Sequence, residues 1–208
     1  MRIVHYVNQF FAGIGGEDAA GTGPELRDGA LGPGRRLASV LGDEHEIVAT
    51  AICGDDYAAS HPEFAAELVA QARERGAEMV VAGPSFTSGR YGMACARIAA
   101  AASEAGLPAL AAMHPENPGL GEAAGTTVVE SGATSRHMRD SLDRLAAAIG
   151  KVAAGAELTA QDGRIGPVAR TNRMAERSAA ERAVALVLTR LGGDREATEI
   201  PLPDFDSV

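Results

Sequence analysis

The sequence has no long apolar run and no cluster of basic residues. Its 208 residues include 19 Lys and Arg against 28 Asp and Glu, for a formal net charge of −9. This acidic balance argues against nucleic acid and anionic membrane surfaces as partners. A membrane-crossing helix needs about 20 mostly apolar residues, and the opening MRIVHYVNQF lacks a signal-peptide cleavage site. We therefore expect a soluble cytoplasmic protein whose partners are small molecules or other proteins.

Cysteine and aromatic residues are also scarce. The chain has no Trp and only two cysteines, Cys53 and Cys95, which lack the paired spacing of a zinc or thioredoxin-like site. We expect free thiols in a reducing cytosol, with Cys95 buried on the apolar stripe of a helix. Apolar residues still make up 46% of the chain, which is enough to bury the core of one medium-sized domain.

Short apolar runs alternate along the chain with segments of helical period. Strands are expected at 2–7, 45–54, 77–83, within 107–119 and at 126–132. Helices are expected at 33–42, 64–76, in the second half of 80–105, at 138–152 and at 174–193. The glycine-rich segment 10–34 is expected to be a long loop.

This alternation predicts an α/β fold. We expect a mostly parallel, doubly wound sheet of about five strands, Rossmann-like or flavodoxin-like, with helices on both faces and an extended C-terminal tail. The α/β domain is expected to span 1–155. Residues 156–208 are expected to form a connection, a helix and the tail, packed on the same domain or on a partner.

The join between a strand and a helix within 80–105 is rich in hydrogen-bonding side chains. In such sheets ligands bind at the carboxyl ends of the strands. Ser85 and Ser88 can donate to an anion, Arg90 can pair with a carboxylate through two bonds, and Tyr91 follows directly. The amides at the start of the helix would add positive potential. The alternative is a capping turn with Arg90 on the surface.

Other strand ends supply further candidates. Asn8, Gly15 and Gly16 follow the first strand, but GIGGED lacks the spacing of a dinucleotide-binding or Walker motif, so a flexible turn is the alternative. Cys53 ends the second strand, as a thiol at the edge or as a small buried residue. His114 could act as acid or base with Glu116 orienting it, unless both belong to a plain loop. We expect no metal site.

Five uncommon blocks occur in a fixed order along the chain: VHYVNQFFAGIGGE, GPELRDGALGPG, EIVATAICGD, VAGPSFTSGRYGMAC and IPLPDFDSV. Together they resemble the N-terminal half of the selenoprotein B family, the large subunit of protein B in glycine, sarcosine and betaine reductases. The similarity runs from Met1 to about the last residue. It implies a subunit, or half of a subunit, of an oxidoreductase that is active only in a complex.

The resemblance also implies a reaction and its partners. In that family a pyruvoyl-containing subunit captures the amine of glycine, and a selenocysteine of the large subunit attacks the α-carbon. Ammonia leaves, and the resulting carboxymethyl group passes to a small selenoprotein carrier. The reactive selenocysteine, or the cysteine that replaces it, lies in the second half of the subunit, and neither Cys53 nor Cys95 matches it. The nucleophile and the pyruvoyl group are therefore expected on partner chains, with no cofactor in this one.

On this interpretation the chain is a substrate-binding and assembly half for reductive C–N cleavage of a small amino acid or its N-methylated derivative. The expected substrate-binding residues are Arg90, Ser85, Ser88, Tyr91, Asn8, Gly15 and Gly16. The expected catalytic or polar lining residues are Cys53, His114 and Glu116. Two alternatives are a noncatalytic scaffold subunit and a sulfur-dependent, reductase-like enzyme for another small carboxylic acid.

Overall fold

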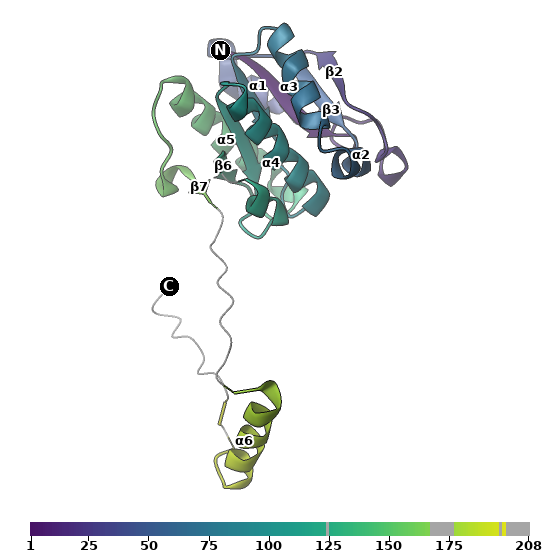
Figure 1. Cartoon of the computed structure of the whole chain (residues 1–208). Coiled ribbons are helices and arrows are strands. Elements are labelled where there is room, and N and C mark those ends of the chain that lie inside the picture. Colours follow the sequence, from purple (N-terminus) through teal and green to yellow (C-terminus); the bar gives the residue numbers. More distant parts are fainter. Residues whose placement is uncertain (124, 167–176, 196, 199–208) are drawn as a thin grey trace. The chain divides into compact units, whose positions relative to one another are not determined.

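The computed structural model describes residues 1–123, 125–166, 177–195 and 197–198. Contacts within the chain divide it into two units, Met1–Val168 and Ala169–Val208. The first unit holds one sheet with helices on both of its faces, and the second holds a single described helix (Figure 1). The predicted boundary at 155 stays a prediction, but residues beyond it contribute a strand to the sheet.

The sheet of the first unit has seven strands. They are β1 Arg2–Asn8, β2 Glu25–Asp28, β3 Glu46–Cys53, β4 Met79–Ala82, β5 Ala109–Met113, β6 Thr127–Glu130 and β7 Arg164–Ile165. Their spatial order is β2-β3-β1-β4-β5-β6-β7. The five central strands are parallel, while β2 and β7 pair antiparallel at the two edges. Taken alone, the parallel strands follow the order 2-1-3-4-5, which occurs in doubly wound sheets.

Helices cover both faces of this sheet, as predicted. The helices of the first unit are α1 Gly34–Leu41, α2 Asp55–Ser60, α3 Phe64–Glu74, α4 Gly89–Glu104 and α5 Met138–Ala153. Alternate residues of β1 enter different cores: Val4 and Tyr6 pack with α3 and α4, whereas Ile3 packs with α1 and α5. This alternation is the period of two of a strand buried on both faces.

The prediction of about five strands was wrong at both edges. Segment 10–34, predicted as a loop, contains β2, and β7 was not predicted. β2 has the sequence ELRD and β7 has two residues, so neither carries the apolar run from which a strand can be recognised. Each is held by main-chain pairing with a longer strand, β3 or β6, and such pairing leaves little signal in the side chains.

The second unit contains α6, Ala179–Leu191, within the helix predicted at 174–193. Ser178 caps it: the Ser178 hydroxyl accepts a hydrogen bond from the Glu181 amide, and the Glu181 carboxylate accepts one from the Ser178 amide. The predicted extended tail lies largely outside the described residues, and its packing stays a prediction. None of the described helices has the length and apolar character needed to cross a membrane.

His5 is a buried titratable residue in the middle of β1. Its Nε2 lies 2.6 Å from the carbonyl oxygen of Gly83 and must carry the proton in order to donate. Nδ1 has no hydrogen-bond partner among the described residues, and α1 packs so closely that a Cβ at Gly34 would lie 2.9 Å from it. Burial lowers the pKa of His5 to about 4, against a smaller opposing effect of the Gly83 bond.

We predict that His5 makes the fold sensitive to acid. Because its pKa is lower in the folded than in the unfolded chain, the unfolded state takes up the proton first, and stability falls as pH drops from about 6.5 to about 4. The full effect is about 3 kcal/mol. Urea denaturation at several pH values should show that His5→Gln removes most of this dependence, while His61→Gln at an exposed position does not. Parallel losses in wild type and H5Q would contradict the prediction.

Candidate functional site

A cavity of about 530 Å³ opens at the carboxyl ends of β1, β4 and β6. Its lining is Asn8, Gln9, Phe10, Phe11, Gly16, Glu17, Asp55, Ser85, Phe86, Thr87, Ser88, Tyr91, Ala133, Thr134 and Ser135. The chain leaves β1 for β3 on one side and later returns to β4 on the other, so the cavity lies where the strand order reverses. Open α/β sheets bind ligands at such a switch point, and this volume suits a small molecule.

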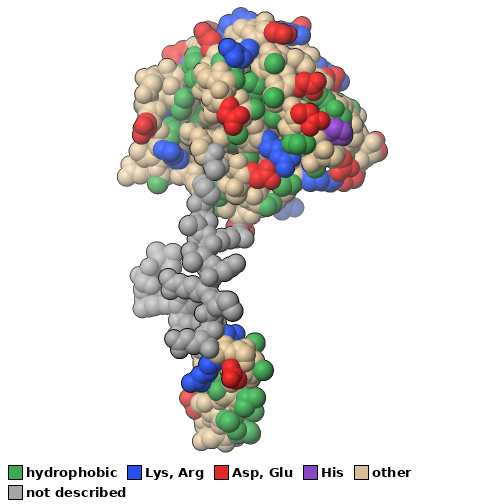
Figure 2. Space-filling view, viewed as in Figure 1, with side chains coloured by type: hydrophobic (Ala, Val, Ile, Leu, Met, Phe, Trp, Pro, Cys, Tyr) green, Lys and Arg blue, Asp and Glu red, His purple; other side chains and the backbone are tan. Residues whose placement is uncertain are grey.

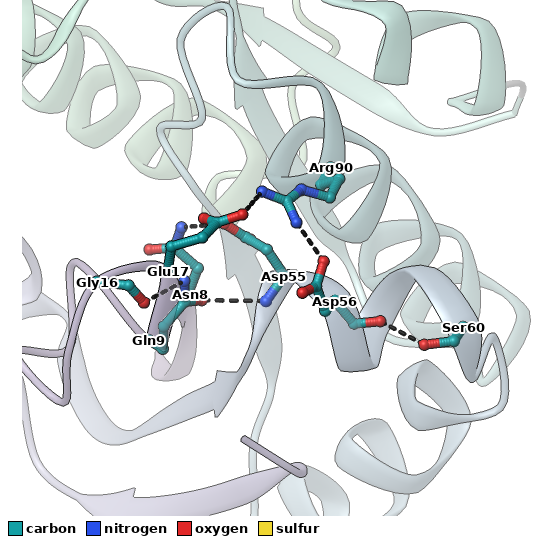
Figure 3. A network of polar contacts seen from close by, with 8 residues as sticks. All are labelled: Asn8, Gln9, Gly16, Glu17, Asp55, Asp56, Ser60 and Arg90. Carbon is teal, nitrogen blue, oxygen red and sulfur yellow. Dashed lines mark hydrogen bonds and ion pairs between the residues drawn. The ribbon is translucent and has the colours of Figure 1, made fainter. Parts of the chain in front are cut away.

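The end of β1 and the start of α2 are tied together in one wall of the cavity (Figure 3). Asn8 donates from Nδ2 to Oδ2 of Asp55 at 2.9 Å, and the main-chain N–H of Asp55 donates to Oε1 of Gln9 at 3.0 Å. Asn8 also accepts the amide of Phe11 at 3.0 Å, and Nε2 of Gln9 lies 3.4 Å from the Gly16 carbonyl. Two adjacent amide side chains therefore fix both Asp55 and the loop that follows β1.

Asp55 is the buried carboxyl group of this wall. It is 7% exposed, and Oδ1 has no hydrogen-bond partner among the described residues. Burial and, to a smaller extent, the charge of Glu17 raise the pKa of Asp55 above its ordinary value, while the hydrogen bond from Asn8 and the charge of Arg90 lower it. A buried carboxyl oxygen without a hydrogen-bond partner lowers the stability of the fold, and Asp55 places such an oxygen in the wall of the cavity.

A second wall is the loop between β4 and α4, which Asn117 holds in place. Nδ2 of Asn117 donates to the carbonyls of Phe86 at 2.7 Å and Ser88 at 3.0 Å, and Oδ1 accepts the amide of Gly119. Phe86 has a φ of 54°, which is rare for a bulky residue. A Cβ at Gly92 would lie 2.0 Å from Asn117 Oδ1, so only glycine fits there. Asn117 thus maintains a strained loop beside the cavity, as occurs at functional sites.

The structure places the predicted serines differently. Ser85 is buried and donates from Oγ to the carbonyl of Ala112 at 3.2 Å, so its proton serves the fold. Ser88 is exposed and is the N-cap residue of α4, yet its side chain makes no capping bond. Tyr91 is fully buried, and its ring packs 6.0 Å from that of Tyr6 and 5.8 Å from that of Phe11. All three predicted residues line the cavity, and of the two serines Ser88 is the one with a free hydroxyl for a ligand.

Arg90 lies on the first turn of α4 but does not line the cavity. Its guanidinium pairs with Glu17 on the loop after β1 and with Asp56 on α2 (Figure 3). It therefore bridges three segments, and both of its terminal nitrogens are engaged by protein carboxylates. The anchoring role predicted for Arg90 stays a prediction, because a substrate would have to displace these partners.

We predict that Arg90→Ala loosens the loop after β1. Exposed ion pairs contribute about 0.5–1 kcal/mol, so amide exchange in residues 9–22 should become roughly two- to fivefold faster while global stability changes little. Hydrogen exchange read by mass spectrometry measures this. Arg36→Ala is the matched control, because it removes the exposed pair between Arg36 and Asp143, which lies between α1 and α5. Unchanged exchange in 9–22 for R90A would contradict the prediction.

The two predicted loop glycines differ in position. Gly16 lines the cavity, and its amide donates to Oδ1 of Asp18 at 3.1 Å. Gly15 is not in the lining, and a Cβ there would lie 2.8 Å from Cβ of Ala19. Gly15 is thus explained by close packing.

Cys53 is buried at the end of β3 and does not line the cavity. Its Sγ lies 3.8 Å from the carbonyl oxygen of Thr22, and burial raises the pKa of the thiol to about 12. Burial also raises the pKa of Cys95 on α4 well above its ordinary value. A nucleophilic thiol needs access and a low pKa, so neither cysteine has the surroundings of a nucleophile.

His114 and Glu116 follow β5 and also lie outside the lining. They touch through the main-chain N–H of Glu116, which donates to Nδ1 of His114 at 3.2 Å, rather than through the predicted carboxylate contact. Within the described ranges no group of three or more His, Cys, Asp or Glu could hold a metal ion. The acid–base roles of His114 and Glu116 stay predictions.

The cavity lining also contains residues without a predicted binding role, among them Gln9, Asp55, Thr134 and Ser135. Asp55 directly follows β3, and a carboxylate at a strand end is a signal that could have placed it here. Thr134 and Ser135 follow β6, where Thr134 is the N-cap residue and Ser135 the first residue of a short 3-10 helix before α5. Gln9 directly follows β1 and shares this strand-end signal, but its contact with Asp55 joins residues 46 positions apart and could not be predicted from the sequence.

The fold and the cavity define a class of protein: an α/β protein with a cavity of small-molecule size at the carboxyl edge of its parallel strands. Over residues 1–208 the sequence matches the family described as glycine/sarcosine/betaine reductase selenoprotein B. The chain belongs to this family. No solved structure matches it.

Relatives within this family are components of reductase complexes. The glycine reductase complex component B subunit gamma of Symbiobacterium thermophilum is 44% identical over 212 residues, and the sarcosine reductase complex component B subunit beta of Peptoclostridium acidaminophilum is 41% identical over 220. The betaine reductase complex component B subunit beta of the latter organism is 32% identical over 214 residues. Each match covers 100% of this chain and 49% of the relative, so the chain spans about half the length of these relatives.

Proposed function

We propose that this chain is the substrate-binding half of a reductase subunit. With partner chains it carries out reductive C–N cleavage of glycine, sarcosine or a similar small amino acid. The observation that carries this proposal is the cavity at the strand-order reversal, lined by Asp55, Ser88 and the start of α4. The family membership and the names of the relatives support the reaction class.

The carboxylate of the substrate would bind at the start of α4. The first amides of a long helix have no partner within the helix and carry a partial positive charge. Ser88 adds a hydroxyl at the same point, because its side chain does not cap the helix. The carboxylate would thereby be held while a selenolate or thiolate approaches the adjacent carbon, which is catalysis by positioning.

The nucleophile would come from another part of the assembly. Both cysteines of this chain are buried, and burial raises the pKa of each thiol. We therefore assign the selenocysteine or cysteine to the second half of the subunit, the pyruvoyl group to a separate subunit, and acceptance of the product to a small carrier protein. Arg90 would hold the loop over the cavity through Glu17 and Asp56.

We predict that Ser88→Ala lowers kcat/KM of the reconstituted complex for glycine by roughly ten- to a hundredfold, the effect of removing a hydrogen bond to a charged group. Ammonia release from glycine measures it. Ser103→Ala is the matched control on the last turn of α4, where Oγ bonds the carbonyl of Ala99 at 2.9 Å. Equal rates for S88A and wild type would count against this cavity as the substrate site.

A role in assembly is favoured by the apolar face of α6. Val184, Val187, Leu188 and Leu191 recur at helical spacing and are 55–78% exposed, and hydrophobic side chains gather along the second unit in Figure 2. Exposed apolar faces of this kind mark interaction surfaces. We assign this face to the second half of the subunit, because the relatives are about twice as long as this chain.

We predict that Leu188→Asp weakens binding of this chain to a separately produced second half by at least roughly tenfold, because burying a leucine is worth about 1.5–3 kcal/mol. Biolayer interferometry measures the dissociation constant. Thr189→Asp, which adds the same charge outside the apolar spacing, should have a much smaller effect. If the two variants bind equally well, α6 does not contact the second half.

A further inference from the structure

Asp55 lies in the cavity wall, and none of the described residues bonds one of its two carboxyl oxygens. Its Oδ2 accepts from Asn8 at 2.9 Å, and its main-chain N–H is held by Gln9 at 3.0 Å. These two bonds fix the position of the carboxyl group, while Oδ1 has no hydrogen-bond partner among the described residues. The residue is 7% exposed and lines the cavity. The orphaned oxygen is therefore buried and held in a fixed orientation, in a residue that lines the cavity.

The neighbouring charges leave Asp55 as the unneutralised acid of the cavity. Glu17 also lines the cavity, but its carboxylate is paired with Arg90. The other terminal nitrogen of Arg90 pairs with Asp56, and no ion pair joins Arg90 to Asp55 among the described residues. The carboxyl group of Asp55 thus receives one neutral amide bond from the protein and no salt bridge within the described residues. A donor from a ligand would complete it.

The chemistry of the surroundings favours a protonated amine over a metal ion. No group of three or more His, Cys, Asp or Glu in the described part of the chain could hold a cation, and one carboxylate with a single free oxygen is too few ligands for a metal such as calcium or magnesium. An ammonium group needs only acceptors placed in hydrogen-bond range.

The cavity also has two poles. One part of its lining is the start of α4 with Ser88, where backbone dipoles favour negative charge. Another part is Asp55, which favours positive charge. A ligand that carries both a carboxylate and an ammonium group would match these two poles.

We propose that Oδ1 of Asp55 accepts a hydrogen bond from the ammonium group of a zwitterionic amino acid, and that it selects ligands with an N–H over quaternary ammonium compounds. This inference rests on the proposed function, because the carboxylate end is the one assigned above. It adds the residue that recognises the amine. A primary or secondary amine such as glycine or sarcosine can donate to Oδ1, whereas betaine has no N–H and brings three methyl groups to a buried oxygen.

The test is calorimetric titration of the chain, assembled with its second half, with glycine, sarcosine and betaine. The wild type should bind glycine and sarcosine at least roughly tenfold more tightly than betaine. Asp55→Asn should weaken glycine and sarcosine by roughly ten- to a hundredfold, the effect of losing a hydrogen bond between charged groups. The preference over betaine should fall to within about threefold. Asp43→Asn is the control, because Asp43 is exposed, lies outside the lining and belongs to neither wall of the cavity.

Thermal unfolding separates a ligand role from a structural one. Asn is isosteric with Asp, and its amide oxygen can still accept from Asn8. Because the substitution keeps this bond and exchanges one buried polar atom without a partner for another, D55N should unfold at about the same temperature as the ligand-free wild type. A clearly lower melting temperature together with unchanged selectivity would make Asp55 structural and overturn the inference.

Failure of this inference and failure of the proposed function give different results. If S88A weakens glycine binding while D55N leaves the preference over betaine intact, the cavity binds the substrate but Asp55 does not recognise the amine. If wild-type protein binds none of the three compounds, or if neither substitution alters binding, the inference is overturned and the proposed site with it.

Discussion

The contact between the end of β1 and the start of α2 is the constraint on which the cavity depends. Asn8 and Gln9 occupy consecutive positions, and one holds the side chain of Asp55 while the other holds its main chain. Asn8 also accepts a hydrogen bond from the Phe11 amide, and Gln9 reaches the carbonyl of Gly16. The side chains that position Asp55 therefore also shape the loop after β1. A change at either amide would alter both the wall and the charge of the site.

The β4–α4 loop forms the other wall of the cavity, and close packing rather than charge sets its geometry. Asn117 satisfies three main-chain groups, and it can do so only because Gly92 leaves room for its side chain. Gly119 likewise approaches the backbone of Gly92 too closely for a Cβ. The start of α4 is thus fixed by residues that never reach the cavity, and it can present its amides without rearrangement.

The main features of the fold were predictable from the sequence, because the five central strands and their helices carry apolar residues in runs or at regular spacings that indicate each element. The edge strands were not, since ELRD and a two-residue pair are held by main-chain bonds alone. Five predicted binding residues do line the cavity, namely Asn8, Gly16, Ser85, Ser88 and Tyr91, because strand ends converge in a parallel sheet. The direction of each side chain was harder to predict. Cys53 lies on the same face of β3 as Ala49 and Ala51, four and two residues earlier, and that face packs into the core.

The edge strands have a consequence for how such a subunit can be joined to others. A parallel sheet with a long open edge invites pairing with strands of other chains. Here one edge is a four-residue strand with three charged side chains, and the other is two residues long. Within the described residues, these short edges leave little of the backbone ladder for a foreign strand to extend. Among the described residues, the helices and loops therefore offer a partner more surface than the sheet edges do. Their side chains can discriminate one partner from another, which the sequence-blind hydrogen bonds of a growing sheet cannot.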